Sequence, residues 1–134
     1  MDKRLTGLSI VVVDDDEDVL DSFAAALEAE GAEVEAVSDG NAGVRAVHDL
    51  KPDLVVLDMM LPGRSGFLAL EKIKGREDSP LVIMVTANEG KRHQAYAESL
   101  GVDSYLQKPV PLGSLVECVQ TLIEKRRSEE AGNS

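Results

Sequence analysis

The sequence predicts an α/β fold in which helices cover both faces of a parallel sheet. Short apolar runs alternate along the chain with longer segments whose apolar residues recur with the α-helical period of about 3.6 residues. Several runs are almost continuously apolar, as expected for strands that are covered on both faces. With 134 residues, 43% of them hydrophobic, the chain is long enough for one domain with a sizeable core.

Five apolar runs are expected to form the strands. In chain order they are Leu8 to Val13, Val34 to Val37, Leu54 to Leu57, Leu81 to Val85, and Tyr105 with Leu106. The first, third and fourth are near-continuously apolar, which favours strands of a parallel sheet over half-exposed ones.

A helical pattern follows each of these strands. The apolar positions are, in order, Val19, Phe23, Ala26 and Leu27; Ala42, Ala46, Val47 and Leu50; Leu68, Leu70 and Ile73; Ala95, Ala97 and Leu100; and Leu112, Leu115, Val116, Val119, Leu122 and Ile123. Pro52 ends the second helix, while Gly75 and Gly101 lie near the ends of the third and fourth. Five β-α units with right-handed crossovers result.

Polar residues stand where the strands end. Asp14 and Asp15 follow the first strand, Asp58 the third, Thr86 the fourth and Lys108 the fifth. The carboxyl ends of parallel strands meet at one edge of a sheet, and ligands bind there. We therefore expect carboxylates, a hydroxyl and an ammonium group in one pocket. All-oxygen ligands suit Mg²⁺, and the set suits a phosphoryl group with an aspartate as nucleophile.

A structural role is the alternative for each of these residues. Acidic residues after a strand often cap the next helix, which is the favoured interpretation for Asp16, Glu17 and Asp18. Thr86 could be a β-branched strand residue with a capping role, and a lysine such as Lys108 is usually a solvated surface charge. Capping does not explain why carboxylates recur at the ends of two separate strands.

Five stretches together resemble the receiver domain of two-component response regulators. They are Val11–Asp15, Pro52–Gly63 with Gly66, Val85–Ala87, Gly101–Tyr105 and Lys108–Pro109. They occur in order and at the family's spacing over essentially the whole chain, so their combination is much more specific than any one alone. The resemblance implies a flavodoxin-like three-layer sandwich: a five-stranded parallel sheet in the order 2-1-3-4-5 with five helices.

The resemblance also implies a metal site and a phosphoacceptor. Asp58 would accept a phosphoryl group from the phosphohistidine of a sensor histidine kinase or a histidine phosphotransfer protein. Asp15, Asp58 and the backbone carbonyl of Met60 would ligate Mg²⁺ directly, and Asp14 would act largely through water. Hydrolysis of the aspartyl phosphate would then limit the lifetime of the signal.

Three further residues take roles by the same resemblance. Thr86 and Lys108 would bind phosphoryl oxygens, and a cis Lys108–Pro109 bond is implied. Tyr105 would be the switch aromatic that turns inward as Thr86 moves toward the phosphoryl group. The fourth helix, the fifth strand and the last helix would form the face that changes and binds an output protein.

Some positions depart from the family's transcription-factor branch. That branch carries an aspartate, a glutamate and an arginine across a dimer face where this chain has Ser104, Ser114 and Cys118. That dimer is therefore not expected, and Cys118 is expected to fill the core.

Other polar and aromatic positions receive plainer interpretations. Met60 and Asn88 occupy positions that tune dephosphorylation in the family, and Phe67 is expected in the loop beside the pocket as a lid or packing residue. His48 and His93 fall on expected helices, and neither is expected to bind metal or relay phosphate.

Composition excludes several classes of function. With 25 acidic and 14 basic residues the formal charge is −11, which opposes direct binding to nucleic acid or anionic membrane. Neither a signal peptide nor a membrane-spanning run is present, and one cysteine permits no intrachain disulfide. We expect a cytoplasmic protein with one receiver domain, residues 1–127, and a frayed polar tail, residues 128–134.

Two other functions fit part of the pattern. A haloacid-dehalogenase-like phosphatase also uses Mg²⁺ and an aspartate nucleophile, and Asp14–Asp16 loosely fits its motif, but its nucleophile follows the first strand and Asp58 is left unexplained. A degenerate receiver serving as a constitutive binding module is the second, although all five site residues are present. We expect a self-phosphorylating and self-dephosphorylating signal receiver and not a turnover enzyme.

Overall fold

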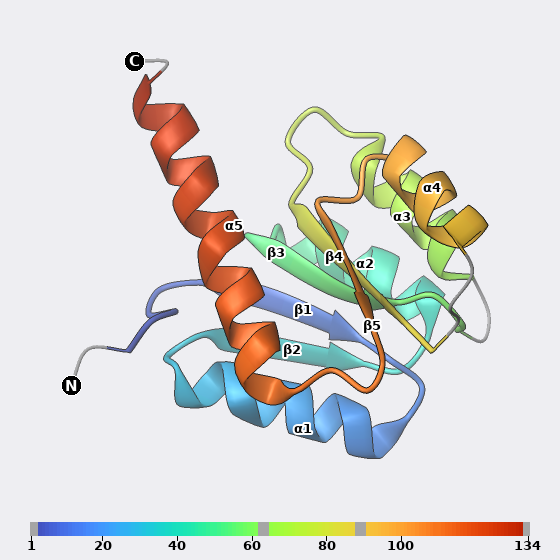
Figure 1. Ribbon diagram of the computed structural model, residues 1–134, viewed down its shortest axis with the longest axis horizontal. Coiled ribbons are helices and arrows are strands. Elements are labelled where there is room, and N and C mark those ends of the chain that lie inside the picture. The colour runs from blue at the N-terminus through green and yellow to red at the C-terminus, as the bar shows by residue number, and fades with distance from the viewer. Residues whose placement is uncertain (1–2, 62–64, 88–90, 133–134) are drawn as a thin grey trace.

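The computed structural model describes residues 3–61, 65–87 and 91–132 of the chain. Within these residues five parallel strands form one sheet in the order β2-β1-β3-β4-β5, as the family resemblance implies (Figure 1). The strands are β1 (Ser9–Val13), β2 (Glu33–Val37), β3 (Leu54–Asp58), β4 (Leu81–Thr86) and β5 (Ser104–Gln107). Positions Pro62, Gly63 and Asn88, to which the sequence analysis refers, lie outside the described residues.

Helices cover both faces of the sheet. They are α1 (Glu17–Ala29), α2 (Gly40–Leu50), α3 (Gly66–Lys74), α4 (Lys91–Ser99) and α5 (Leu112–Gly132). In Figure 1, α1 and α5 lie on one side of the strands and α2, α3 and α4 on the other. The first three helices begin at side chains that accept backbone N–H groups, namely Asp16, Asp39 and Ser65.

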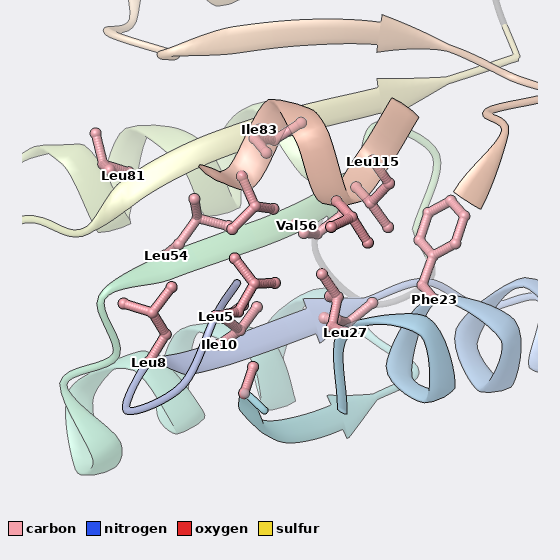
Figure 2. Packing of buried hydrophobic residues seen from close by; sticks show 14 of the residues in the cluster. Leu5, Leu8, Ile10, Phe23, Leu27, Leu54, Val56, Leu81, Ile83 and Leu115 are labelled. Atoms are coloured by element: carbon pink, nitrogen blue, oxygen red, sulfur yellow. The ribbon is translucent and has the colours of Figure 1, made fainter. Parts of the chain in front are cut away.

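Two hydrophobic cores separate these layers, because alternate residues of each strand point to opposite faces. The first packs Ile10, Val12 and Val56 against Phe23 and Leu27 of α1 and against α5 (Figure 2). The second packs the intervening strand residues against α2, α3 and α4, and includes Val11, Val13, Val55, Leu57, Leu70, Ile73 and Ala97. Residues of β3 are buried throughout, as the continuous apolar run predicts.

The strand register determines where the functional residues lie. Val13 pairs with Leu57, so the next residues, Asp14 and Asp58, leave neighbouring strands at the same level. Thr86 pairs with Gln107, and the Lys108 amide donates to the Thr86 carbonyl at 2.7 Å. The three central strands and β5 therefore deliver their polar residues to one edge.

The last helix is longer than the sequence pattern indicates. The polar sequence after Arg127 predicts fraying, whereas α5 is helical as far as Gly132. Glutamate and alanine are good helix formers, so the helix continues past its last buried residue, Ile123, without an apolar stripe. The boundary of the domain at residue 127 stays a prediction.

Candidate functional site

The polar edge of the sheet contains a small, mostly buried acidic cluster. Asp14 is 2% exposed and Asp58 is 5% exposed, whereas Asp15 is exposed to solvent. One carboxylate oxygen from each of these three residues lies within 4.8 Å of the others. Such burial of two carboxylates is unusual unless cations compensate their charge.

Lys108 supplies a cation of the protein's own. Its Nζ lies 2.9 Å from Asp14 Oδ2 and 3.6 Å from Asp58 Oδ2. Burial alone would lower the pKa of this ammonium group, but the hydrogen bond to Asp14 and the charge of Asp58 outweigh burial and raise it. Lys108 is therefore charged and directed into the cluster. The bond between Lys108 and Pro109 is cis, as the family resemblance implies.

One ammonium group does not neutralise three carboxylates. Burial, and then the charge of Asp14, raise the pKa of Asp58 from 3.8 to about 6, although Lys108 and the Met60 amide oppose this rise. The Met60 N–H lies 3.4 Å from Asp58 Oδ1. The residual negative charge and the set of oxygen donors, which contains no nitrogen or sulfur ligand, fit a hard divalent cation such as Mg²⁺.

Helix α1 orients one of the carboxylates. The amide of Asp16 donates to Asp14 Oδ1 at 2.9 Å, which leaves Oδ2 for Lys108. Asp16 itself accepts from the amides of Asp18 and Val19, at 3.0 and 3.3 Å, and so caps the helix. The structural interpretation is therefore confirmed for Asp16, and it does not extend to Asp14.

Glycine is required where α3 begins beside the cluster. A Cβ atom on Gly66 would lie 2.4 Å from the carbonyl oxygen of Asp58 and 2.6 Å from Cα of Met59. The Gly66 amide also donates to the Met59 carbonyl at 2.9 Å. This close approach holds the segment after β3 in place. In the sequence Gly66 is recognisable only as part of a motif, because close packing against the backbone of another segment leaves no local pattern.

The sequence of the chain matches one family over most of its length. The model of the family described as "Response regulator receiver domain" matches residues 10–120, which include every residue of the cluster. The chain belongs to this receiver domain family.

Solved structures of receiver domains share the fold. The CheY-like response regulator receiver domain protein from Methanospirillum hungatei JF-1 is 30% identical, with a TM-score of 0.87 over 91% of this chain and 98% of that chain. The beryllofluoride-activated DrrB receiver domain is 29% identical, with a TM-score of 0.78 over 87% of this chain and 97% of that chain. NtrX from Brucella abortus, in complex with ATP, is 26% identical with a TM-score of 0.87; the match covers 96% of this chain and 29% of that one.

Two residues of the receiver domain connect the site to β5. Thr86 is fully buried at the end of β4. The Tyr105 hydroxyl is also buried, beside the Thr86 side chain but outside ordinary hydrogen-bond geometry. Burial raises the pKa of this phenol, and Thr86 opposes the rise. The aromatic ring packs against the core formed with α2, α3 and α4, so Tyr105 is turned inward in this structure.

The remaining aromatic and histidine side chains make contacts of other kinds. Phe67 belongs to α3 and not to the preceding loop; its ring stacks on His93 at 5.9 Å and meets Tyr96 edge-on at 5.0 Å. It is thus a packing residue that joins α3 to α4. His48 contacts Asp49 at 3.1 Å on the surface. Among the described residues, the cluster that could hold a metal contains neither histidine.

Cys118 is half-buried at the edge of the first core, and its Sγ lies 3.4 Å from Ser104 Oγ. No helix in residues 3–61, 65–87 and 91–132 is both long and apolar enough to cross a bilayer.

Proposed function

We propose that this receiver domain accepts a phosphoryl group on Asp58 from the phosphohistidine of a sensor histidine kinase or a histidine phosphotransfer protein. One observation carries the proposal. Asp58 ends the central strand with its carboxylate 3.6 Å from Lys108 and within reach of Asp14 and Asp15. A buried carboxylate beside a charged lysine and an oxygen-lined cation site is the arrangement that phosphoryl transfer needs.

The transfer itself exchanges one bond of phosphorus for another. An Asp58 carboxylate oxygen attacks phosphorus, the P–N bond to the donor's imidazole breaks, and the electron pair of that bond stays on the imidazole nitrogen, which takes up a proton. Lys108 stabilises negative charge on the phosphoryl oxygens as the bonds change. Its 2.9 Å contact with Asp14 holds the ammonium group at the site before the donor arrives.

The carboxylates would also hold the metal ion. Asp15 and Asp58, with the backbone carbonyl of Met60, would bind Mg²⁺ directly, and Asp14 would bind it through water. When bound, Mg²⁺ supplies charge neutralisation and orientation of the phosphoryl oxygens. Asp58 needs that neutralisation, because burial first, and then the charge of Asp14, raise its pKa and disfavour the ionised carboxylate.

Phosphorylation would shift an equilibrium of conformations and would not refold the domain, because the phosphoryl group adds contacts only with Thr86, Lys108 and Mg²⁺. Thr86 and Tyr105 are adjacent, so a movement of Thr86 changes the space available to the phenol. The face formed by α4, β5 and α5 would then bind an output protein in one of the two states.

Hydrogen exchange tests this switch. We expect exchange rates in residues 91–123 to change when the protein is treated with beryllofluoride and Mg²⁺. Changes confined to α1 and α2 would contradict the proposed face. A Thr86→Ala variant, which binds the metal but lacks the hydroxyl, should show a smaller response.

Family membership and the site geometry favour a receiver over the two alternatives. A haloacid-dehalogenase-like phosphatase leaves Asp58 without a role. A degenerate receiver is disfavoured because Asp14, Asp15, Asp58, Thr86 and Lys108 are all present. The acidic composition further supports a cytoplasmic receiver that acts on proteins and does not contact nucleic acid or membrane directly.

Labelling with a small phosphodonor tests the acceptor. Acetyl phosphate with Mg²⁺ should add one phosphate in intact-mass spectra, and Asp58→Asn should abolish the addition because an amide cannot form an acyl phosphate. Asp49→Asn, which changes an exposed aspartate, is the matched control and should label as the parent does. Full labelling of Asp58→Asn would refute the assignment.

A further inference from the structure

A second concave surface lies between α2 and α3, distinct from the acidic cluster. The groove has a volume of about 970 Å³ and is lined from Asn41 to His48 on α2 and from Leu68 to Arg76 on and after α3. Both stretches correspond to about two helical turns, so the groove is roughly 10 to 12 Å long. None of its lining residues belongs to the candidate phosphoacceptor site.

The groove carries positive charge on a strongly acidic chain. Its permanently charged lining residues are three cations, Arg45, Lys72 and Arg76, and one carboxylate, Glu71. The formal charge of the whole chain is −11. None of the three cations forms an ion pair with another residue in the described part of the chain. This concentration of uncompensated cations selects an anionic ligand.

The same groove offers some apolar surface, from Val44 on α2 and from Leu68 on α3, which has 57% of its surface exposed. Val47 and Ile73 also line the groove but are themselves almost fully buried. An apolar side chain of a partner that covers Leu68 would remove this surface from water. A simple inorganic anion would use the cations and leave this surface unused.

We propose that the α2–α3 groove binds an acidic amphipathic helix of a partner protein. Two turns of such a helix match the length of the groove, with apolar side chains placed on Leu68 and Val44 and carboxylates placed toward Arg45 and Lys72. Nucleic acid is a poor occupant, because three cations do not overcome the charge of the chain.

A second copy of this chain is also a poor occupant. The acidic helix α1 already buries its apolar side chains Leu20, Phe23 and Leu27 in the first core. The part of α5 after Ile123 is polar and has no apolar stripe that could pack into the groove. The inferred partner is therefore a different protein. This interaction goes beyond the proposed phosphotransfer and does not depend on it.

The test uses a synthetic probe helix and the whole chain. An acetylated and amidated peptide of about 15 residues, with leucine at positions i, i+4, i+7 and i+11 and glutamate on the remaining surface, represents the proposed ligand. Titration into ¹⁵N-labelled protein should shift amide signals of α2 and α3. Charge reversal at Arg45 and Lys72 together should weaken binding at least about tenfold, since each cation meets carboxylates of the probe.

Matched variants separate the groove from general effects. Arg127→Glu reverses an exposed cation on α5 and should leave probe binding unchanged. Leu68→Ser should weaken binding, whereas Leu112→Ser, at a comparably exposed leucine on α5, should not. Circular dichroism confirms that each variant is folded, and acetyl phosphate labelling of Asp58 should persist in all four.

Three outcomes would overturn the proposal. Shifts that fall outside α2 and α3 would place the probe elsewhere. Equal binding of a scrambled peptide of the same composition would show a plain anion site and not a helix groove. Concentration-dependent shifts of α2 and α3 without any peptide would show that a second copy of this chain occupies the groove.

Discussion

Replacing Asp58 with asparagine should stabilise the metal-free protein at neutral pH. The buried carboxyl has a pKa of about 6 in the folded chain, against an ordinary value of 3.8. The folded state thus holds the proton more tightly than the unfolded state, and ionisation of Asp58 destabilises the native fold. At about 1.4 kcal/mol per pKa unit the full penalty is about 3 kcal/mol.

The pH dependence follows from the sign of this shift. Below pH 3.8 Asp58 is protonated in both states and adds no penalty. The penalty grows as the pH rises from 3.8 to about 6 and is complete above that value. Asparagine removes it, and Lys108 keeps its 2.9 Å partner Asp14. We expect a gain of about 1 to 3 kcal/mol at pH 7.5, falling to about half a kcal/mol at pH 4.

Urea unfolding in EDTA measures this gain. The midpoint of the Asp58→Asn variant should exceed that of the parent at pH 7.5, with an unchanged slope, and the two should converge toward pH 4. Asp49→Asn, at an exposed site, should lie within about 0.5 kcal/mol of the parent throughout. An Asp58→Asn variant no more stable than the parent at pH 7.5, or a gain that persists unchanged at pH 4, would refute the reasoning.

Two further changes probe the metal site and the packing beside it. Mg²⁺ at ten times its dissociation constant should stabilise the parent by about 1.4 kcal/mol, and Asp15→Ala should remove most of that gain; a melting temperature indifferent to millimolar Mg²⁺ would contradict the site. Gly66→Ala should destabilise the fold by about 1 to 3 kcal/mol, because the new Cβ would meet backbone atoms of residues 58 and 59. Gly113→Ala, on α5 with no atom within 4 Å of the added Cβ, is its control and should be neutral or stabilising.

The strands and the site residues could be predicted because their signals are local. Continuous apolar runs identify strands covered on both faces, and β1, β3 and β4 begin and end within one residue of the expected bounds. Chain order then places Asp14, Asp58, Thr86 and Lys108 after strands. Parallel strands end at a common edge, so the neighbourhood of these side chains follows from topology without coordinates.

Some features could not be predicted because they depend on neighbours that are distant in sequence. The sequence predicts a loop position for Phe67, yet this residue lies in α3 and stacks on His93 of α4. The end of α5 is a different case: it has no apolar period, and only the weak signal of intrinsic helix propensity favours extending the helix to Gly132.

The strands, the residues at their ends and the family could all be recognised in the amino-acid sequence, because alternating periods and residues at strand ends are properties of the chain alone. How the charges of the site are balanced depends on the folded structure. The raised pKa of Asp58 arises from burial and from Asp14, which follows β1, and the need for glycine at position 66 arises from the backbone at the end of β3 and just after it. The groove between α2 and α3 likewise exists only where two helices meet, since its cations lie on separate segments of the chain.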